Sequence, residues 1–139
     1  MKRMIIVAIL TASTTLGANA QKLSTSKVPA NVKSAFATTY PTAKSVQWEK
    51  EKTGEYEVNF EQGQEEMSVV YNAQGIALEV EVEIAASDLP AAVQNALKGK
   101  KIKEAARITK GGKTYYEAEV GGKDLLFDTN GQALPATEG

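Results

Sequence analysis

The stretch SVVYNAQGIAL, from Ser68 to Leu78, returns in outline 56 residues later as DLLFDTNGQAL, from Asp124 to Leu134. In both stretches an apolar run ends in an aromatic residue, an Asn or Asp follows, and a glycine stands three residues further on. Asn, Asp and Gly in this order are typical of tight hairpin turns, in which glycine supplies a positive φ. The sequence therefore predicts the same β-hairpin twice.

The segments upstream of the two hairpins also match, in the same order. LPAAV at 89–93 corresponds to VPANV at 28–32, and YEAEV at 116–120 corresponds to YEVNF at 56–60. Three matches in one order indicate two copies of a single unit. We therefore predict a first copy over residues 28–86 and a second copy over residues 87–139, preceded by a linker at residues 21–27.

Each copy is predicted to open with a helix and to continue as a β-meander. Proline stands where the first helical turn would begin, at Pro29 and Pro90, and apolar residues then recur at helical spacing. The clearest strand pattern is an apolar alternation that includes Ile76, Leu78, Val80, Val82 and Ile84. The predicted fold class is α+β: a tandem repeat of a helix plus an antiparallel β-meander, with each helix across one face of its own meander.

The first twenty residues resemble a secretory signal peptide. Lys2 and Arg3 precede an uncharged, mostly apolar run, and Ala18-Asn19-Ala20 supplies small residues at the −3 and −1 positions of a cleavage site. We predict cleavage after Ala20 and a periplasmic or secreted protein; an uncleaved anchor helix is the alternative. No cysteine follows the apolar run, so a lipid-modified N-terminus is not expected.

Composition narrows the classes of function. The 139 residues include no cysteine and no histidine, which removes disulfides, thiol chemistry and the commonest general base. Loss of Lys2 and Arg3 with the leader would take the formal net charge from −1 to −3. A mildly acidic chain without a basic block is a poor nucleic-acid binder. We expect a protein that is not an enzyme and carries no cofactor.

The chain resembles a known family in its structural motifs. After a leader come VPANVKSAFATTYPTAKSVQWEKEKTGEYEVNF, the turn YNAQG and the restart LPAAVQNAL. This order is similar to that of the PepSY-like family of small exported proteins, common in Bacteroides-type bacteria, whose fold is also called beta-lactamase-inhibitor-protein-like. The resemblance implies protein binding through an open sheet face, and it supplies no contact residue that can be carried over.

Glutamates dominate the polar side of neighbouring predicted strands. The set is Glu55, Glu57, Glu61, Glu79, Glu81 and Glu83. We take Glu57, Glu79, Glu81 and Glu83 as a candidate acidic face for a cation or a small ligand. The alternative is a solvated face whose like charges discourage edge-to-edge aggregation.

Three apolar residues have the opposite strand parity to the predicted core. Tyr115, Leu126 and Val70 would lie on the open face, where exposed apolar and aromatic groups beside polar ones are typical of a protein-binding patch. The alternative is a second minor core where the two copies meet.

Two further features have simpler interpretations. Asp124, Asp128 and Asn130 faintly resemble a calcium loop but lack its full spacing and its final Glu, so a hairpin turn is the better prediction. Trp48 is predicted in the core, with Ile108 in its place in the second copy. The leading hypothesis is a non-enzymatic binding module for an unidentified envelope or extracellular protein or peptide, with inhibition of that partner left open and with no membrane span after cleavage.

Overall fold

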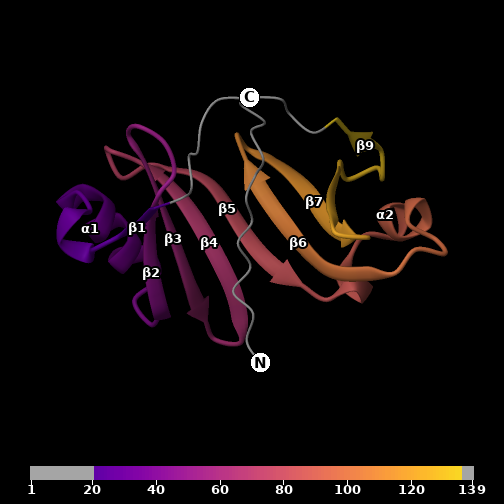
Figure 1. Ribbon diagram of the computed structural model, residues 1–139, viewed down its shortest axis with the longest axis horizontal. Helices are drawn as coiled ribbons and strands as arrows, with labels where there is room; N and C mark the ends of the chain where they lie inside the picture. Colours follow the sequence, from indigo (N-terminus) through magenta and orange to yellow (C-terminus); the bar gives the residue numbers. More distant parts are fainter. Residues whose placement is uncertain (1–20, 136–139) are drawn as a thin grey trace.

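The computed structural model describes residues 21–135, so the predicted leader and its cleavage site lie outside the described residues. Within them, nine strands form one antiparallel sheet in which every strand pairs with the next along the chain (Figure 1). The strands are β1 (Gln21–Leu23), β2 (Lys44–Lys50), β3 (Glu55–Gln62), β4 (Glu65–Asn72), β5 (Ala77–Ile84), β6 (Ile102–Lys110), β7 (Lys113–Val120), β8 (Lys123–Phe127) and β9 (Ala133–Leu134). The helices are α1 (Ala30–Thr39) and α2 (Ala91–Ala96), each preceded by a short 3-10 turn, η1 (Thr25–Lys27) and η2 (Ala86–Asp88).

The two predicted copies occupy consecutive halves of this sheet. In the first half α1 is followed by β2 to β5, and in the second half α2 is followed by β6 to β9. Strands β5 and β6 pair from Glu79↔Lys110 to Ile84↔Ala105, so the two meanders join into one sheet. Residues 21–27, which the sequence predicts as a linker, instead form β1 and η1, and Leu23 packs against the first core.

Both helices cover the same face of the sheet, and each packs on a core of its own. Val80 packs against the first core and Ile84 against the second, and these two residues point to the same side of β5. The first core consists of Val28, Val32, Phe36, Trp48, Val58, Phe60, Val69 and Tyr71. The second core consists of Leu89, Val93, Leu97, Ala105, Ala118 and Phe127.

Aromatic side chains distinguish the first core from the second. The Phe36 ring meets the rings of Trp48 and Phe60 edge to face, with centroids 5.5 and 4.9 Å apart. This arrangement suits the ring quadrupoles and adds to the hydrophobic stabilisation. Trp48 therefore lies in the core, as the sequence predicts.

The pairing corrects two details of the sequence analysis. Trp48 pairs with Val58 on the helix side, whereas Ile108 pairs with Tyr115 on the opposite side, so Ile108 does not replace Trp48. The apolar alternation from Ile76 is also interrupted: Ile76 is 59% exposed and Leu78 is 37% exposed. Ile76 lies in the turn before β5, and a register shift after Val70 leaves Leu78 without a direct partner on β4.

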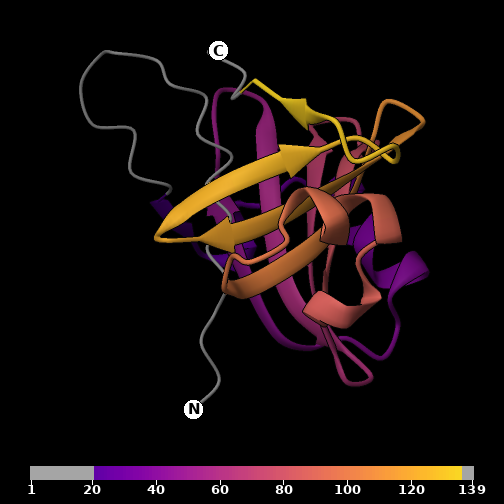
Figure 2. The same ribbon diagram turned by 90° about the vertical axis from the view of Figure 1, so that its right-hand side faces the viewer.

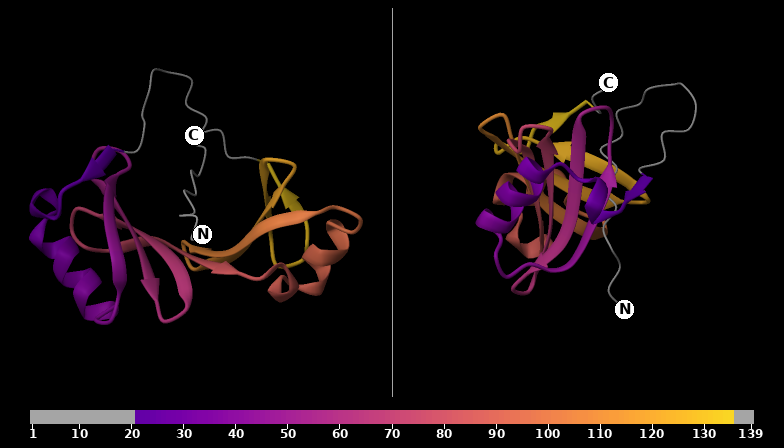
Figure 3. Two further views of the ribbon diagram at one scale, coloured as in Figure 1. Left: turned by 60° about the horizontal axis from the view of Figure 1, so that its bottom comes forward. Right: turned by 90° about the vertical axis from the view of Figure 1, so that its left-hand side faces the viewer.

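The sheet is strongly bent. In Figure 1, α1 and α2 lie at opposite ends of the molecule with the strands between them, and Figure 2 shows α2 in front of the strands of its own half. Figure 3 shows the two halves of the sheet inclined toward each other on the side away from the helices. We call this concave side, which α1 and α2 leave uncovered, the open face.

Candidate functional site

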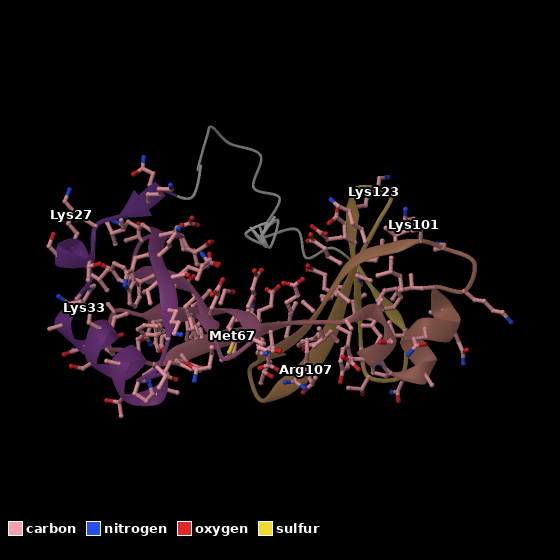
Figure 4. All side chains as sticks on the ribbon, turned by 90° about the horizontal axis from the view of Figure 1, so that it is seen from below. Lys27, Lys33, Met67, Lys101, Arg107 and Lys123 are labelled. Atoms are coloured by element: carbon pink, nitrogen blue, oxygen red, sulfur yellow. The ribbon has the colours of Figure 1, made fainter. Side chains whose placement is uncertain are left out.

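The open face carries carboxyl groups from several neighbouring strands. Strand pairing places Val70 between Glu57 and Glu79, and it places Glu81 between Ser68 and Ile108. Glu117 lies on the same face, between Ala106 and Leu126. Figure 4 shows oxygen-tipped side chains gathered between the two halves of the sheet. The acidic cluster is defined here as Glu57, Glu79, Glu81 and Glu117.

Three members of the acidic cluster are buried although α1 and α2 both lie on the other face of the sheet. Glu57 is 5% exposed, Glu79 6% and Glu81 5%. The sequence pattern left open a solvated acidic face, and the structure contradicts that alternative for these three residues. On this face the two halves of the sheet incline toward each other (Figure 3), and Glu117 on β7 and Asp124 on β8 act electrostatically on Glu81.

Burial makes these carboxyl groups unusually weak acids. Desolvation raises the pKa of Glu57 to about 9, and a side-chain hydrogen bond with Glu51 adds to the effect. Desolvation also raises the pKa of Glu81 to about 9, reinforced by the charges of Glu117 and Glu79. A carboxyl group with such a pKa holds its proton at neutral pH, because the ionised form is poorly solvated and repelled by its neighbours.

The flanking acids follow the same trend. Burial raises the pKa of Glu117 to about 7, assisted by the charge of Asp124. Burial raises the pKa of Glu83 to about 7 as well, and its side chain shares a hydrogen bond with Glu66. The open face therefore combines two acids that stay neutral at pH 7 with two that are half ionised there.

Only part of the acidic cluster is neutralised by a cation within the described chain. Lys110 Nζ lies 3.1 Å from Glu79 Oε2, and this contact opposes the rise in the pKa of Glu79. Glu81 has no hydrogen bond and no ion pair with any residue of 21–135, and acidic groups alone reach it electrostatically. A buried polar group without a partner is costly, so Glu81 is a feature of this face that a ligand would stabilise.

Apolar residues lie beside the acidic cluster. The pairing places Tyr115, Leu126 and Val70 on the open face, which is the side that strand parity predicted; a role for them in binding stays a prediction. Ala106 and Ile108 lie on the same face, 3% and 4% exposed, whereas the sequence pattern placed Ile108 in the core and did not indicate Ala106 as a site residue. Their strand parity could have revealed them, had the β5–β6 pairing been known.

The faint calcium motif is a turn in the structure. Asp128 Oδ1 accepts hydrogen bonds from the backbone N–H groups of Asn130 at 2.8 Å and Gln132 at 3.0 Å. Asn72 Oδ1 accepts the equivalent bonds from Gln74 and Ile76, both at 3.0 Å. Within residues 21–135, no group of three or more acidic side chains is arranged to hold a metal ion.

A second hollow lies on the helix side, between α1 and the β4–β5 hairpin. Its volume is about 510 Å³, and it is lined mainly by small and apolar residues around Tyr40 and Tyr71. Burial raises the pKa of Tyr71 to about 12, so its hydroxyl stays protonated at physiological pH. This hollow contains no acid, base or nucleophile that is active near neutral pH, so the open face is the stronger candidate.

The fold and the open face together define a class of protein: a helix-on-sheet unit present twice, with one uncovered, concave sheet face. The chain belongs to the family described as "Putative beta-lactamase-inhibitor-like, PepSY-like", whose model matches residues 15–78 and again 55–134. Membership confirms the resemblance indicated by the sequence, and the two matches are consistent with a tandem repeat. The family description is that of an inhibitor-like module.

Solved structures of related shape come from Bacteroides. A protein of Bacteroides eggerthii described as "putative periplasmic" is 20% identical, with a TM-score of 0.69 over 77% of this chain and 86% of that one. A DUF2874 family protein of Bacteroides uniformis is 22% identical, with a TM-score of 0.67 over 76% and 86%. A BLIP-like protein of Bacteroides fragilis is 23% identical, with a TM-score of 0.62 over 76% and 83%. These similarities establish the fold.

Two further findings concern curated proteins and membrane spans. No protein with a curated description matches the chain. None of the helices formed by residues 21–135 has the length and apolar character needed to cross a membrane.

Proposed function

We propose that the protein is a non-enzymatic binding module that recognises another protein or a peptide through its open face. The observation that carries this proposal is Glu81, a buried carboxyl group on an uncovered sheet face with no partner in the described chain. Half-buried apolar groups at Tyr115, Leu126 and Val70 lie on the same face. Buried apolar anchors beside polar groups are typical of the centre of a protein interface.

The inhibitor-like description of the family and the BLIP-like neighbour support the same proposal. Whether binding inhibits the partner depends on which surface of that partner is covered, so the proposal concerns recognition alone. A concave sheet face suits a protruding loop or an extended segment better than a flat surface, because both walls can contact such a segment.

The test is affinity capture with matched variants. Residues 21–139 are immobilised, envelope extract of the source organism is passed over them, and a Tyr115→Ala/Leu126→Ala variant is run in parallel. Ile76→Ala is the control, because Ile76 is 59% exposed and lies outside the strands of the open face. Retention of one protein by the wild type and the control, with loss in the double variant, supports the proposal. Equal retention by a folded double variant contradicts it.

A second candidate function is the binding of a small cationic ligand by Glu57, Glu79, Glu81 and Glu83. Glu81 favours this candidate as well, because a free organic cation that displaces its proton would pair with the same carboxyl group. The two candidates differ in the apolar residues, which a small cation would not need. Melting of the wild type and of Glu81→Gln with millimolar cations separates them.

We also infer export, with cleavage after Ala20. The leader pattern supports this inference, as does the description of the Bacteroides eggerthii neighbour as periplasmic. Mass spectrometry of the native protein tests it: a mature chain beginning at Gln21 agrees, and an intact leader contradicts it.

A further inference from the structure

We propose that Glu81 is an anchor for one basic side chain, an arginine or a lysine carried by an extended segment or loop of the partner. This inference rests on the proposed function and specifies the chemistry of the partner. Glu81 lies in the middle of β5, the strand of the first half that pairs with the second half, so a side chain that reaches it must enter between the two halves.

The neighbours of Glu81 suit the stem and the head of a basic side chain. On β4 its cross-strand neighbour is Ser68, whose hydroxyl offers a further acceptor, and on β6 it is the apolar Ile108. Tyr115 lies beyond Ile108 in the same row across the sheet. Lysine and arginine bury apolar stems against such groups while their charged ends reach a carboxylate.

Two of the other acids of the cluster already have partners, and the third, Glu117, is only partly buried, which singles out Glu81. Glu79 is paired with Lys110, and the Glu57 carboxyl shares a hydrogen bond with Glu51. A metal ion needs several converging oxygen ligands, and residues 21–135 contain no such group. A single organic cation needs one carboxyl group that can ionise and further acidic groups around it, which is the arrangement at Glu81.

Binding of this kind is coupled to a proton. The charged and titratable groups that act on Glu81 come from four elements: Glu57 on β3, Glu79 and Glu83 on β5, Glu117 on β7 and Asp124 on β8. Lys110 on β6 is engaged by Glu79. Since the pKa of Glu81 is about 9 in the free protein, a cation that pairs with its carboxylate must displace a proton at pH 7. Affinity should therefore rise about tenfold for each pH unit between 6 and 8.

The test uses a defined probe, the peptide Ac-Ala-Ala-Arg-Ala-Ala-NH2, and its citrulline counterpart, which has nearly the same shape and no charge. Binding is followed by the backbone amide signals of Ser68, Glu81 and Ile108 in ¹H–¹⁵N spectra at pH 6, 7 and 8. Glu65→Gln is the control variant, since Glu65 is exposed at the start of β4 and pairs with Gln62.

The expected result is a saturable shift with the arginine peptide that strengthens with pH. The affinity should be at least about tenfold lower for the citrulline peptide, and at least about tenfold lower for the arginine peptide in Glu81→Gln. It should be unchanged in Glu65→Gln. Glutamine resembles the neutral carboxyl of the free protein, so Glu81→Gln should keep the fold; the spectrum itself verifies this. Equal binding of the citrulline peptide, unchanged binding by Glu81→Gln, or stronger shifts of the same amides with CaCl₂ would each overturn the anchor.

Failure of the anchor and failure of the proposed function give different results. If Glu81→Gln still captures a partner that Tyr115→Ala/Leu126→Ala loses, recognition through the open face stands and the anchor is wrong. If the arginine peptide binds as expected but no protein is captured, the anchor stands and protein recognition is wrong.

Discussion

The carbonyl oxygen of Asn31, in the first turn of α1, lies only 2.6 Å from the position that a Cβ atom on Gly75 would occupy. Gly131 stands in the same relation to Ala92 in the first turn of α2, at 2.5 Å. Both glycines also have positive φ, +81° and +79°. The repeated hairpin thus places the start of each helix against the turn of its own meander, and only glycine leaves room for that contact.

Replacement of Gly75 or Gly131 by alanine should be strongly destabilising. The left-handed backbone costs alanine about 1–2 kcal/mol, and the clash with the helix carbonyl adds about 1–3 kcal/mol. Gly54→Ala is the matched control, with φ +80° and no atom within 4 Å of the added Cβ. Urea unfolding should show a larger loss in the free energy of unfolding for Gly75→Ala than for Gly54→Ala. Equal losses for the two variants would mean that the contact with the helix contributes nothing.

The Asx residues of the same turns should be interchangeable with each other but not with alanine. Each accepts two backbone N–H bonds, so Asn72→Ala or Asp128→Ala should lower the free energy of unfolding by about 1–2 kcal/mol. Asn72→Asp and Asp128→Asn keep the acceptor oxygen and should change the free energy of unfolding little. A large loss in Asp128→Asn would show that the negative charge of Asp128 has a role beyond the turn.

Local patterns in the sequence predicted most of the fold. Proline at the helix starts, alternating strands and Asx–Gly turns each act within a few residues, so the two helices and the order of strands could be inferred. The joining of the two meanders through β5 and β6 was not predicted, because it depends on contacts between residues far apart in the chain. The misplacement of Ile108 follows from that omission.

The sequence predicted most residues of the candidate site but not their burial on a concave face. Strand parity placed Glu57, Glu79 and Glu81 on one face, together with Val70 and Tyr115. It could not indicate that this face is concave, because sheet curvature arises from twist and from packing of the two halves. Burial of the carboxyl groups, and the inclusion of Glu117 among them, therefore emerged only from the structure.

The first half of the sheet should be the more stable half. Its core has eight buried residues against six in the second, and α1 has ten residues against six in α2. The amides of Lys33 and Gln94 are a matched pair, equivalent in the repeat and bonded to the carbonyl oxygens of Pro29 and Pro90 at 3.1 and 2.9 Å. In native-state hydrogen exchange the Gln94 amide should exchange faster than the Lys33 amide, since a helix with fewer buried contacts opens more readily. Slower exchange at Gln94 would contradict this order.

Stability should fall as the pH rises from about 5 to 8. The pKa of an unfolded glutamate is near 4.5, whereas Glu57 and Glu81 reach about 9 in the folded protein. Between these values the folded state holds protons that the unfolded chain has released. Each such proton lowers the free energy of unfolding by about 1.4 kcal/mol per pH unit. Below the unfolded pKa the contribution is constant, so the full benefit is present only in acid.

The Glu81→Gln variant isolates the contribution of Glu81 to this pH dependence. Glutamine cannot ionise, so the variant should match the wild type near pH 5 and be more stable than it at pH 8, with a shallower dependence between. Urea unfolding at pH 5, 6.5 and 8 measures all three features, and Glu65→Gln should follow the wild-type curve. A wild-type stability that rises from pH 5 to pH 8 would mean that the open-face carboxyl groups are ionised and solvated. It would also remove the reason for assigning Glu81 a cationic partner.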